Sequence, residues 1–243
     1  MAPISSKLFA AVCLAAALFA PVATALAAPP STVRLQVNGQ ALPFPVPQGY
    51  VDAASLSPDL QRMGEAMTGP SNRLLAFWVD PAEVRAMSAG QAEGLKRYYM
   101  LQVHRRREGM ALSAADFQAV RNAVIGDQAS FMQQLRQQMP KVADSVSQQV
   151  QRATGDSKVQ LKVGELQPLG VVFDEPQTFA YLMRTVFDVG DGRPMPMLLG
   201  TVMVRHQDRL VALGAYAVDD GPRAEAWVRQ STKAWASALA SVR

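Results

Sequence analysis

The chain has 243 residues and a formal net charge of +4 at pH 7, with 24 lysines and arginines against 20 aspartates and glutamates. This basic excess is too small to indicate a nucleic-acid-binding protein, which typically has a strongly basic surface. The single cysteine, Cys13, lies in the N-terminal leader described next. Disulfides, a thiol nucleophile and a cysteine-ligated metal are therefore excluded for the rest of the chain.

The segment Met1–Ala27 has the pattern of a secretory signal peptide. Lys7 supplies the positive charge, Leu8–Ala20 is apolar, and Ala25-Leu26-Ala27 is a small-x-small cleavage site. The apolar run is shorter than the roughly 20 residues of a membrane-spanning helix. We therefore predict cleavage near Ala27, a periplasmic location, and a mature chain, 28–243, that folds as a single α+β domain.

Two strands joined by a tight turn are predicted at the start of the mature chain. Thr32–Val37 alternates apolar and polar residues, and Asn38-Gly39 follows. This dipeptide favours a two-residue hairpin, because both turn positions need positive φ. Pro43 and Pro45 in the return strand cannot donate to a strand ladder, so we expect an edge position.

Helices and strands then alternate. Ser57-Pro58-Asp59 predicts a helix start, with Ser57 as N-cap and Pro58 at the first helical position. Leu74–Val79 is almost continuously apolar, as in a central strand, and Tyr98–Val103 is predicted as another strand.

Residues 113–153 are predicted as a long helical section. Ser113 and Asp116 have the spacing of a capping box, Gly126 is a candidate bend, and Pro140 is expected to end or kink the helix. The outer face of 128–151 holds eight glutamines. This face is either a surface that packs on another protein or an ordinary solvated face, and we favour the second interpretation.

Four strand-type segments follow, at 159–166, 169–173, 178–189 and 197–218, the last folded as a pair. A helix after Asp220-Gly221-Pro222 is expected to lie on the sheet with Trp227 and Trp235 buried. Helices gathered on an antiparallel sheet make an α+β sandwich, either two-layer or α/β/α.

This order of elements, with the turn Pro47-Gln48-Gly49-Tyr50, resembles exported bacterial proteins of the DcrB/PsbP-like α+β sandwich fold. Their first hairpin ends in a Pro-x-Gly-aromatic turn, and they close with a long strand pair and a helix, like Met197–Val242 here. The helical section 113–153 is longer than the family's usual plan. The resemblance implies a small binding or accessory protein of membranes and larger assemblies, and it carries over no catalytic residue.

The densest basic run is His104, Arg105, Arg106 and Arg107. On a strand, Arg105 and Arg107 would face one way, and His104 and Arg106 the other. The functional hypothesis is a patch for anionic headgroups, a polyanion or an acidic partner. The alternative, which we favour, is a solvated strand end that protects a sheet edge.

Four sulfur and imidazole side chains lie close in sequence around one predicted hairpin: Met195, Met197, Met203 and His206. Thioethers and imidazole suit Cu(I). However, methionine also fills irregular gaps in protein cores. We favour this second interpretation for Met197 and Met203, so we expect no cofactor.

Catalytic motifs are scarce. The sequence contains no Gly-x-Ser-x-Gly, Ser-x-x-Lys or His-Glu-x-x-His motif. Only His104 and His206 are available for a Ser/His/Asp triad. A carboxylate pair for glycoside cleavage stays open, because such residues are distant along a chain.

Our first hypothesis is a non-catalytic binding or accessory module of the cell envelope. It would act through a surface or groove between the sheet and the helical section, on another envelope protein or an anionic membrane surface. The alternatives are a hydrolase with dispersed catalytic residues and a peripheral protein that binds anionic membrane through His104–Arg107.

Overall fold

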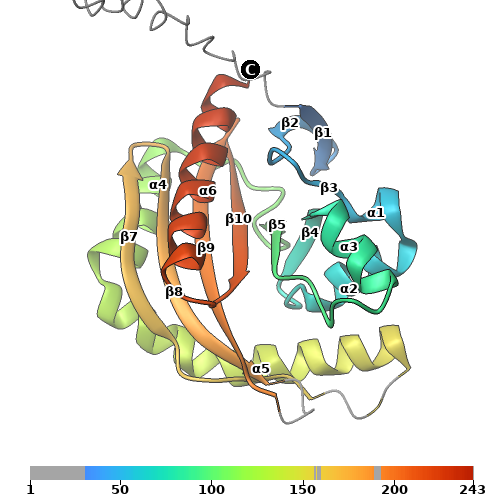
Figure 1. Cartoon of the computed structure of the whole chain (residues 1–243). Helices are drawn as coiled ribbons and strands as arrows, with labels where there is room; N and C mark the ends of the chain where they lie inside the picture. Colours follow the sequence, from blue (N-terminus) through green and yellow to red (C-terminus); the bar gives the residue numbers. More distant parts are fainter. Residues whose placement is uncertain (1–30, 156, 158–159, 189–192, 243) are drawn as a thin grey trace, which may run out of the picture.

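The computed structural model describes residues 31–155, 157, 160–188 and 193–242. Within them, an antiparallel sheet of eight strands carries helices on both faces, and strands β1 and β2 form a separate two-stranded sheet (Figure 1). The predicted α+β sandwich with a long helix is thereby confirmed. The predicted signal peptide lies outside the described residues.

In chain order the elements are β1 (Thr32–Val37), β2 (Gln40–Pro45), β3 (Val51–Asp52), α1 (Ala53–Leu56), α2 (Pro58–Met67), β4 (Asn72–Val79), α3 (Pro81–Ser88), β5 (Arg97–His104), α4 (Ala114–Arg121), the π-helix η1 (Asn122–Gly126), α5 (Gln128–Thr154), β6 (Lys162–Val163), β7 (Gln167–Glu175), β8 (Thr178–Asp188), β9 (Met195–His206), β10 (Arg209–Val218) and α6 (Pro222–Ser241).

The β1–β2 hairpin turns at Asn38 and Gly39, whose φ angles are 49° and 75°. Pro43 and Pro45 lie in β2, which pairs only with β1 in the described structure. Their missing N–H groups therefore cost no ladder bond to a third strand. Both the hairpin and its edge position are confirmed.

The large sheet runs in the order β3-β4-β5-β10-β9-β8-β6, with β7 also paired to β8. The prediction that Leu74–Val79 is a central strand is wrong, because β4 lies beside the two-residue β3 near one end of the sheet. The run is apolar for another reason. Both faces of β4 are covered, and Phe77 and Trp78, which point to opposite faces, are 0% and 1% exposed.

We call face A the sheet face that packs against α6 and the β1–β2 hairpin (Figure 1). Val228, Trp235 and Leu239 of α6 are buried here. Trp235 also donates a hydrogen bond from Nε1 to the Pro45 carbonyl, at 2.9 Å. The expected burial is confirmed for Trp235 but not for Trp227, which is half-buried beneath the Arg97 guanidinium.

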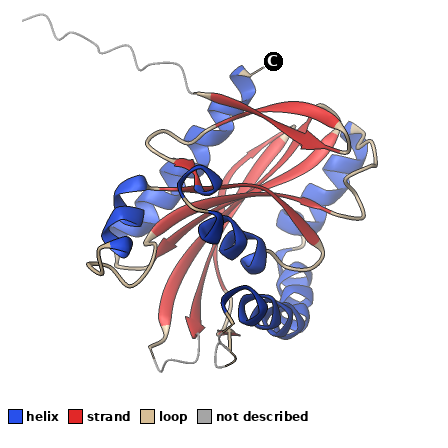
Figure 2. Cartoon of the chain, turned by 90° about the vertical axis from the view of Figure 1, so that its right-hand side faces the viewer, coloured by secondary structure: helices blue, strands red, loops and turns tan. Residues whose placement is uncertain are grey.

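Face B carries the other helices, and Figure 2 shows helices on both sides of the sheet. Two separate apolar clusters form there. One contains Phe77 and Met100 and packs against Leu60 and Met67 of α2. The other contains Met132 of α5 with Leu166 and Met183. The first cluster also packs against Tyr216 of β10, and α2 and α5 contact each other.

The helical section starts at a capping box, as predicted: Ser113 Oγ accepts from the Asp116 N–H at 3.1 Å. It is interrupted at η1, which ends at Gly126, and α5 begins after Asp127. Pro140 does not end α5, which continues to Thr154. Pro140 is exposed, so the carbonyl that its missing N–H leaves free can bond to water.

Candidate functional site

The two central strands, β9 and β10, are buried on face A, and on face B they are partly exposed from the Leu199–Tyr216 pair onward. Along β10 every second residue from Val211 to Ala217 is fully buried, and the residues between them are half-exposed. Strands covered by helices on both faces are normally buried on both. The six residues that we call the open strip form three cross-strand pairs, Leu199–Tyr216, Thr201–Gly214 and Met203–Ala212.

The open strip is mostly apolar, which distinguishes it from an ordinary solvated face. One of its residues, Tyr216, packs against the cluster under α2. Its residues are only partly exposed, but a contiguous apolar patch is more informative than scattered exposed apolar residues. The strip is therefore our principal candidate for a binding surface.

Tyr216 lies flat along the strip. A Cβ placed on Gly214 would be 2.5 Å from Cε2 of this ring and 3.0 Å from its hydroxyl, so only glycine allows this position. The ring also stacks on Tyr98 of β5, with centroids 4.8 Å apart and planes 10° from parallel. In the middle of the strip, the Tyr181 hydroxyl of β8 forms a hydrogen bond with Thr201.

The hydroxyl groups of these tyrosines lie deep, although the residues as a whole are half-exposed. Burial raises the pKa of Tyr216 to about 12, and the nearby Tyr181 hydroxyl adds to this increase. Burial also raises the pKa of Tyr98 and of Tyr181. All three phenols therefore stay neutral at physiological pH and act as hydrogen-bonding groups inside an apolar surface.

Arg105, Arg106 and Arg107 form what we call the basic turn. The predicted strand alternation of these residues is wrong, because β5 ends at His104 and the Arg107 N–H bonds back to the His104 carbonyl at 2.9 Å. All three arginines are exposed. The turn is held by Glu108, which accepts from the Asn38 N–H at 2.9 Å and pairs with Arg73.

The segment after the basic turn crosses one end of the open strip. The Leu112 N–H donates to the Asp208 carbonyl at 2.8 Å, and the Leu112 carbonyl accepts from Arg205 Nε at 2.7 Å. Asp208 and Arg205 flank the ends of β10 and β9, next to the Met203–Ala212 pair. Leu112 therefore lies at the β9–β10 turn, whereas the Arg105 N–H bonds to the Ser71 carbonyl at 2.9 Å, before β4.

The two histidines lie on opposite faces of the sheet. His104 is on face B, and its Nδ1 is buried without a hydrogen-bond partner in the described structure. His206 is on face A, only 8% exposed, with its ring centroid 5.1 Å from that of Phe44. It bonds to the Pro43 backbone, and burial lowers its pKa. Among the described residues, neither histidine pairs with a carboxylate.

The four side chains considered for Cu(I) are not brought together. Met195 is 37% exposed at the start of β9, Met197 is buried, and Met203 belongs to the open strip. His206 stands at the opposite end of β9 and faces the other side of the sheet, because side chains alternate along a strand. The core role predicted for Met197 is confirmed, but the same prediction is wrong for Met203, which is partly exposed.

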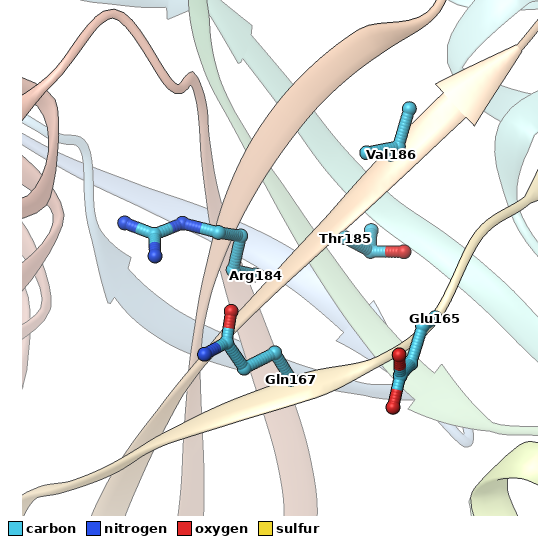
Figure 3. A pocket seen from close by; sticks show the side chains of 5 residues that line it. All are labelled: Glu165, Gln167, Arg184, Thr185 and Val186. Carbon is cyan, nitrogen blue, oxygen red and sulfur yellow. The ribbon is translucent and has the colours of Figure 1, made fainter.

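Two shallow depressions lie elsewhere. The first, about 360 Å³, is lined by Glu165, Gln167, Arg184, Thr185 and Val186, where β6 and β7 meet β8. Figure 3 shows Arg184 and Gln167 away from Glu165. Arg184 Nε is already paired with Asp219, at 2.5 Å. No convergent set of reactive groups faces this depression, so we do not assign a site to it.

The second depression, about 340 Å³, lies beside the glutamine-rich part of α5 and includes Ser147, Gln148 and Lys162. Ser147 has a structural role here, because its Oγ donates to the Ala143 carbonyl and accepts from the Leu161 N–H, both at 2.8 Å. Most of the eight glutamines are exposed. Nothing in their contacts selects a partner over solvent.

Among the described residues, no group of three or more His, Cys, Asp or Glu side chains is placed to hold a metal ion. None of the helices in this part of the chain is both long and apolar enough to cross a membrane.

The comparison with known proteins does not identify a family for this chain. No protein-family model matches the chain. No curated protein matches it either. The structural matches include the Ran-binding protein Mog1p of Saccharomyces cerevisiae, at 12% identity over 88% of this chain and 93% of that chain, and a point mutant of Mog1, at 12% identity over 87% and 93%. Both have a TM-score of 0.30, at which the likeness carries no functional information.

The open strip and its tyrosines were missed in the sequence. Tyr98, Tyr181 and Tyr216 occur in strands that read as buried, and a tyrosine in such a strand is ordinarily a core residue. The spacing Gly214-x-Tyr216 is the one sequence signal for this arrangement. Because Gly214 has no Cβ, the Tyr216 ring has room to lie back along its own strand. The basic turn was found from its composition alone.

Proposed function

We propose that the protein is an exported, non-catalytic binding or accessory module of the cell envelope, and that it binds its partner through the open strip and the basic turn. The observation that carries this proposal is the half-exposed apolar face of β9 and β10, whose other face is completely buried. The leader pattern of Met1–Ala27 supports export.

The chemistry of the surface supports binding. Its apolar side chains contribute area that a partner can bury. The exposed Arg105–Arg107 offer positive charge on a neighbouring surface. Charges at the rim of an interface mainly raise the association rate and select the partner.

Site-specific photo-crosslinking in intact cells tests this proposal. A benzophenone amino acid replaces Met203 in the strip, and a matched control carries it at Val171, an apolar β7 residue that is 42% exposed. We expect a discrete adduct from position 203 and none from position 171. Equal labelling from the two positions, or none from 203, would refute a binding role for the strip.

Export is tested on the same cells. The protein in the periplasmic fraction should begin near Ala28, which mass spectrometry of the intact chain can measure. A chain that stays in the cytosolic fraction with its leader intact would contradict this part of the proposal.

A further inference from the structure

We infer that the outer edge of β1 is a second binding surface, where an extended segment of another protein chain adds a third strand to the β1–β2 sheet. The segment alternates apolar residues with polar ones, of which at least one is acidic. This surface lies on face A and is separate from the open strip, so it goes beyond the proposed function.

The backbone of β1 has unpaired groups along one edge. The Val46 N–H donates to the Ser31 carbonyl at 2.8 Å, and the register is uninterrupted from there to the hairpin turn. In an antiparallel pair, every second residue bonds to the other strand, and the residues between them direct N–H and C=O groups away from it. The residues that point outward are therefore Thr32, Arg34 and Gln36. Of their six groups, the Gln36 carbonyl accepts from Arg73 Nη2 at 2.7 Å, and the other five have no partner in the described structure.

The other strand edges in the described structure are closed or irregular. On the outer edge of β2, the Pro43 backbone bonds to His206 and the Pro45 carbonyl accepts from Trp235 Nε1. β3 and β6 have two residues each, and β7 contains Pro168 and two breaks in its register. Prolines, bulges and short strands are the devices that protect sheet edges in proteins. β1 has six residues without a proline or a bulge, so its edge is open to strand addition.

The side chains next to this edge define the apolar part of the segment. Val33 and Leu35 of β1 and Leu75 of β4 pack against the core on face A but are only half-buried. β2 lies on the side of α6, and β1 on the side away from it (Figure 1). Side chains that point to the same face of neighbouring strands pack together. Alternate residues of an added strand would therefore cover Val33 and Leu35, and apolar side chains there would bury more area.

The charge near the edge favours an acidic segment. Arg34 is exposed, and no carboxylate among the described residues pairs with it. At the turn, Glu108 accepts from the Asn38 N–H, and Arg73 and, more weakly, Arg105 lower the pKa of this carboxyl. Positive charge thus lies along the edge and near its turn end. An acidic residue directly across from Arg34 would form a favourable pair, whereas a second copy of β1 centred on this residue would place two arginines opposite each other.

Photo-crosslinking in intact cells gives the first test. A benzophenone amino acid replaces the exposed Thr32, and the Val171 protein is again the control. The sequenced adduct should contain a segment with apolar residues at i, i+2 and i+4 and an Asp or Glu between them. An adduct with a second copy of this chain, with lipid, or with a segment that lacks this alternation would overturn the inference, as would the absence of an adduct.

The two binding surfaces can be refuted separately. An adduct from position 32 with none from position 203 would refute the open strip and leave the edge of β1 standing. The reverse result would refute the edge alone.

The second test measures binding of the crosslinked segment, made as a labelled peptide, by fluorescence polarisation. Arg34→Pro removes an outward N–H but no bond within the hairpin, where Pro43 already stands directly across. We expect a Kd about tenfold weaker or more, the effect of losing one hydrogen bond, and an unchanged Kd for Arg34→Lys.

Peptides methylated at alternate amide nitrogens extend this test to the unmodified protein. Only one of the two alternate sets of N–H groups can face β1, so methylation of one set should weaken binding and methylation of the other should not. Equal effects of the two sets would overturn the inference. In the complex, amide exchange should slow at Thr32, Arg34 and Gln36, and not at Val33 or Leu35, which already bond to β2. The opposite pattern would also overturn it.

Discussion

Replacing Gly200 with alanine should destabilise the protein by forcing α6 away from the sheet. The added Cβ would lie 2.4 Å from Val228 Cγ1 and 2.8 Å from Thr232 Cγ2. Carbon atoms pack at about 3.5–4.0 Å, so the first contact is short by more than about 1 Å. Neither neighbour can rotate away easily, because β-branched side chains are restricted at χ1 in a helix. The helix itself must therefore move.

The expected magnitude combines two effects. Overpacking of a buried site costs about 1–3 kcal/mol. Replacing glycine by alanine also lowers the entropy of the unfolded chain, which stabilises by about 0.4–1 kcal/mol. We expect a net loss of about 1–2 kcal/mol in the free energy of unfolding, measured by urea denaturation with tryptophan fluorescence.

Two further variants decide whether this reasoning holds. Gly94→Ala is the matched control, because nothing lies within 4 Å of the added Cβ and the residue has no positive φ. It should stay within about 0.5 kcal/mol of the wild type. Val228→Ala removes the closest contact, so the double variant with Gly200→Ala should be more stable than the sum of the single effects by at least about 0.5 kcal/mol. Simple additivity would refute the proposed clash.

Two more predictions concern the attachment of the β1–β2 hairpin. Trp235→Phe removes the indole N–H and leaves the Pro45 carbonyl unpaired, so we expect a loss of about 1–3 kcal/mol. Hydrogen exchange should rise more in the hairpin than in β10, and equal changes would contradict this role. The Arg73 hydrogen bond, with that from the Asn38 N–H, holds the pKa of Glu108 below its ordinary value of 4.5. Its stabilising effect is therefore present above pH 4.5 and lost as pH falls through the lowered pKa. Glu108→Gln should remove this part of the acid destabilisation in pH-dependent unfolding, and an unchanged pH profile would argue against it.

Local signals in the sequence predicted the local structure well. Asn38-Gly39, Ser57 and Ser113 each fix a turn or a helix start through φ angles and hydrogen bonds within a few residues. Such signals do not depend on the rest of the fold, so they could be recognised without it. The α+β class followed from the order of these elements.

Long-range contacts account for what the sequence did not predict. The run in β4 is apolar because both faces of the strand are buried. Although β4 lies near the end of the sheet, the hairpin and α6 cover one face and helices cover the other. The turn at Arg105–Arg107 depends on Glu108, which bonds to residues 35 and 70 positions away. The exposure of Met203 and Tyr216 depends on where α2 and α5 pack, and no periodicity within β9 or β10 encodes that.

The bond between Trp235 and the Pro45 carbonyl joins residues 190 positions apart. Because synthesis proceeds from the N-terminus, the hairpin is made long before the helix that covers it. Contacts of such high sequence separation make folding slow. Val37, Leu42 and Phe44, which are completely buried in the finished protein, must wait for the end of the chain to be covered. Truncation within the last helix should consequently expose the β1–β2 hairpin, rather than the end of the chain, to proteases.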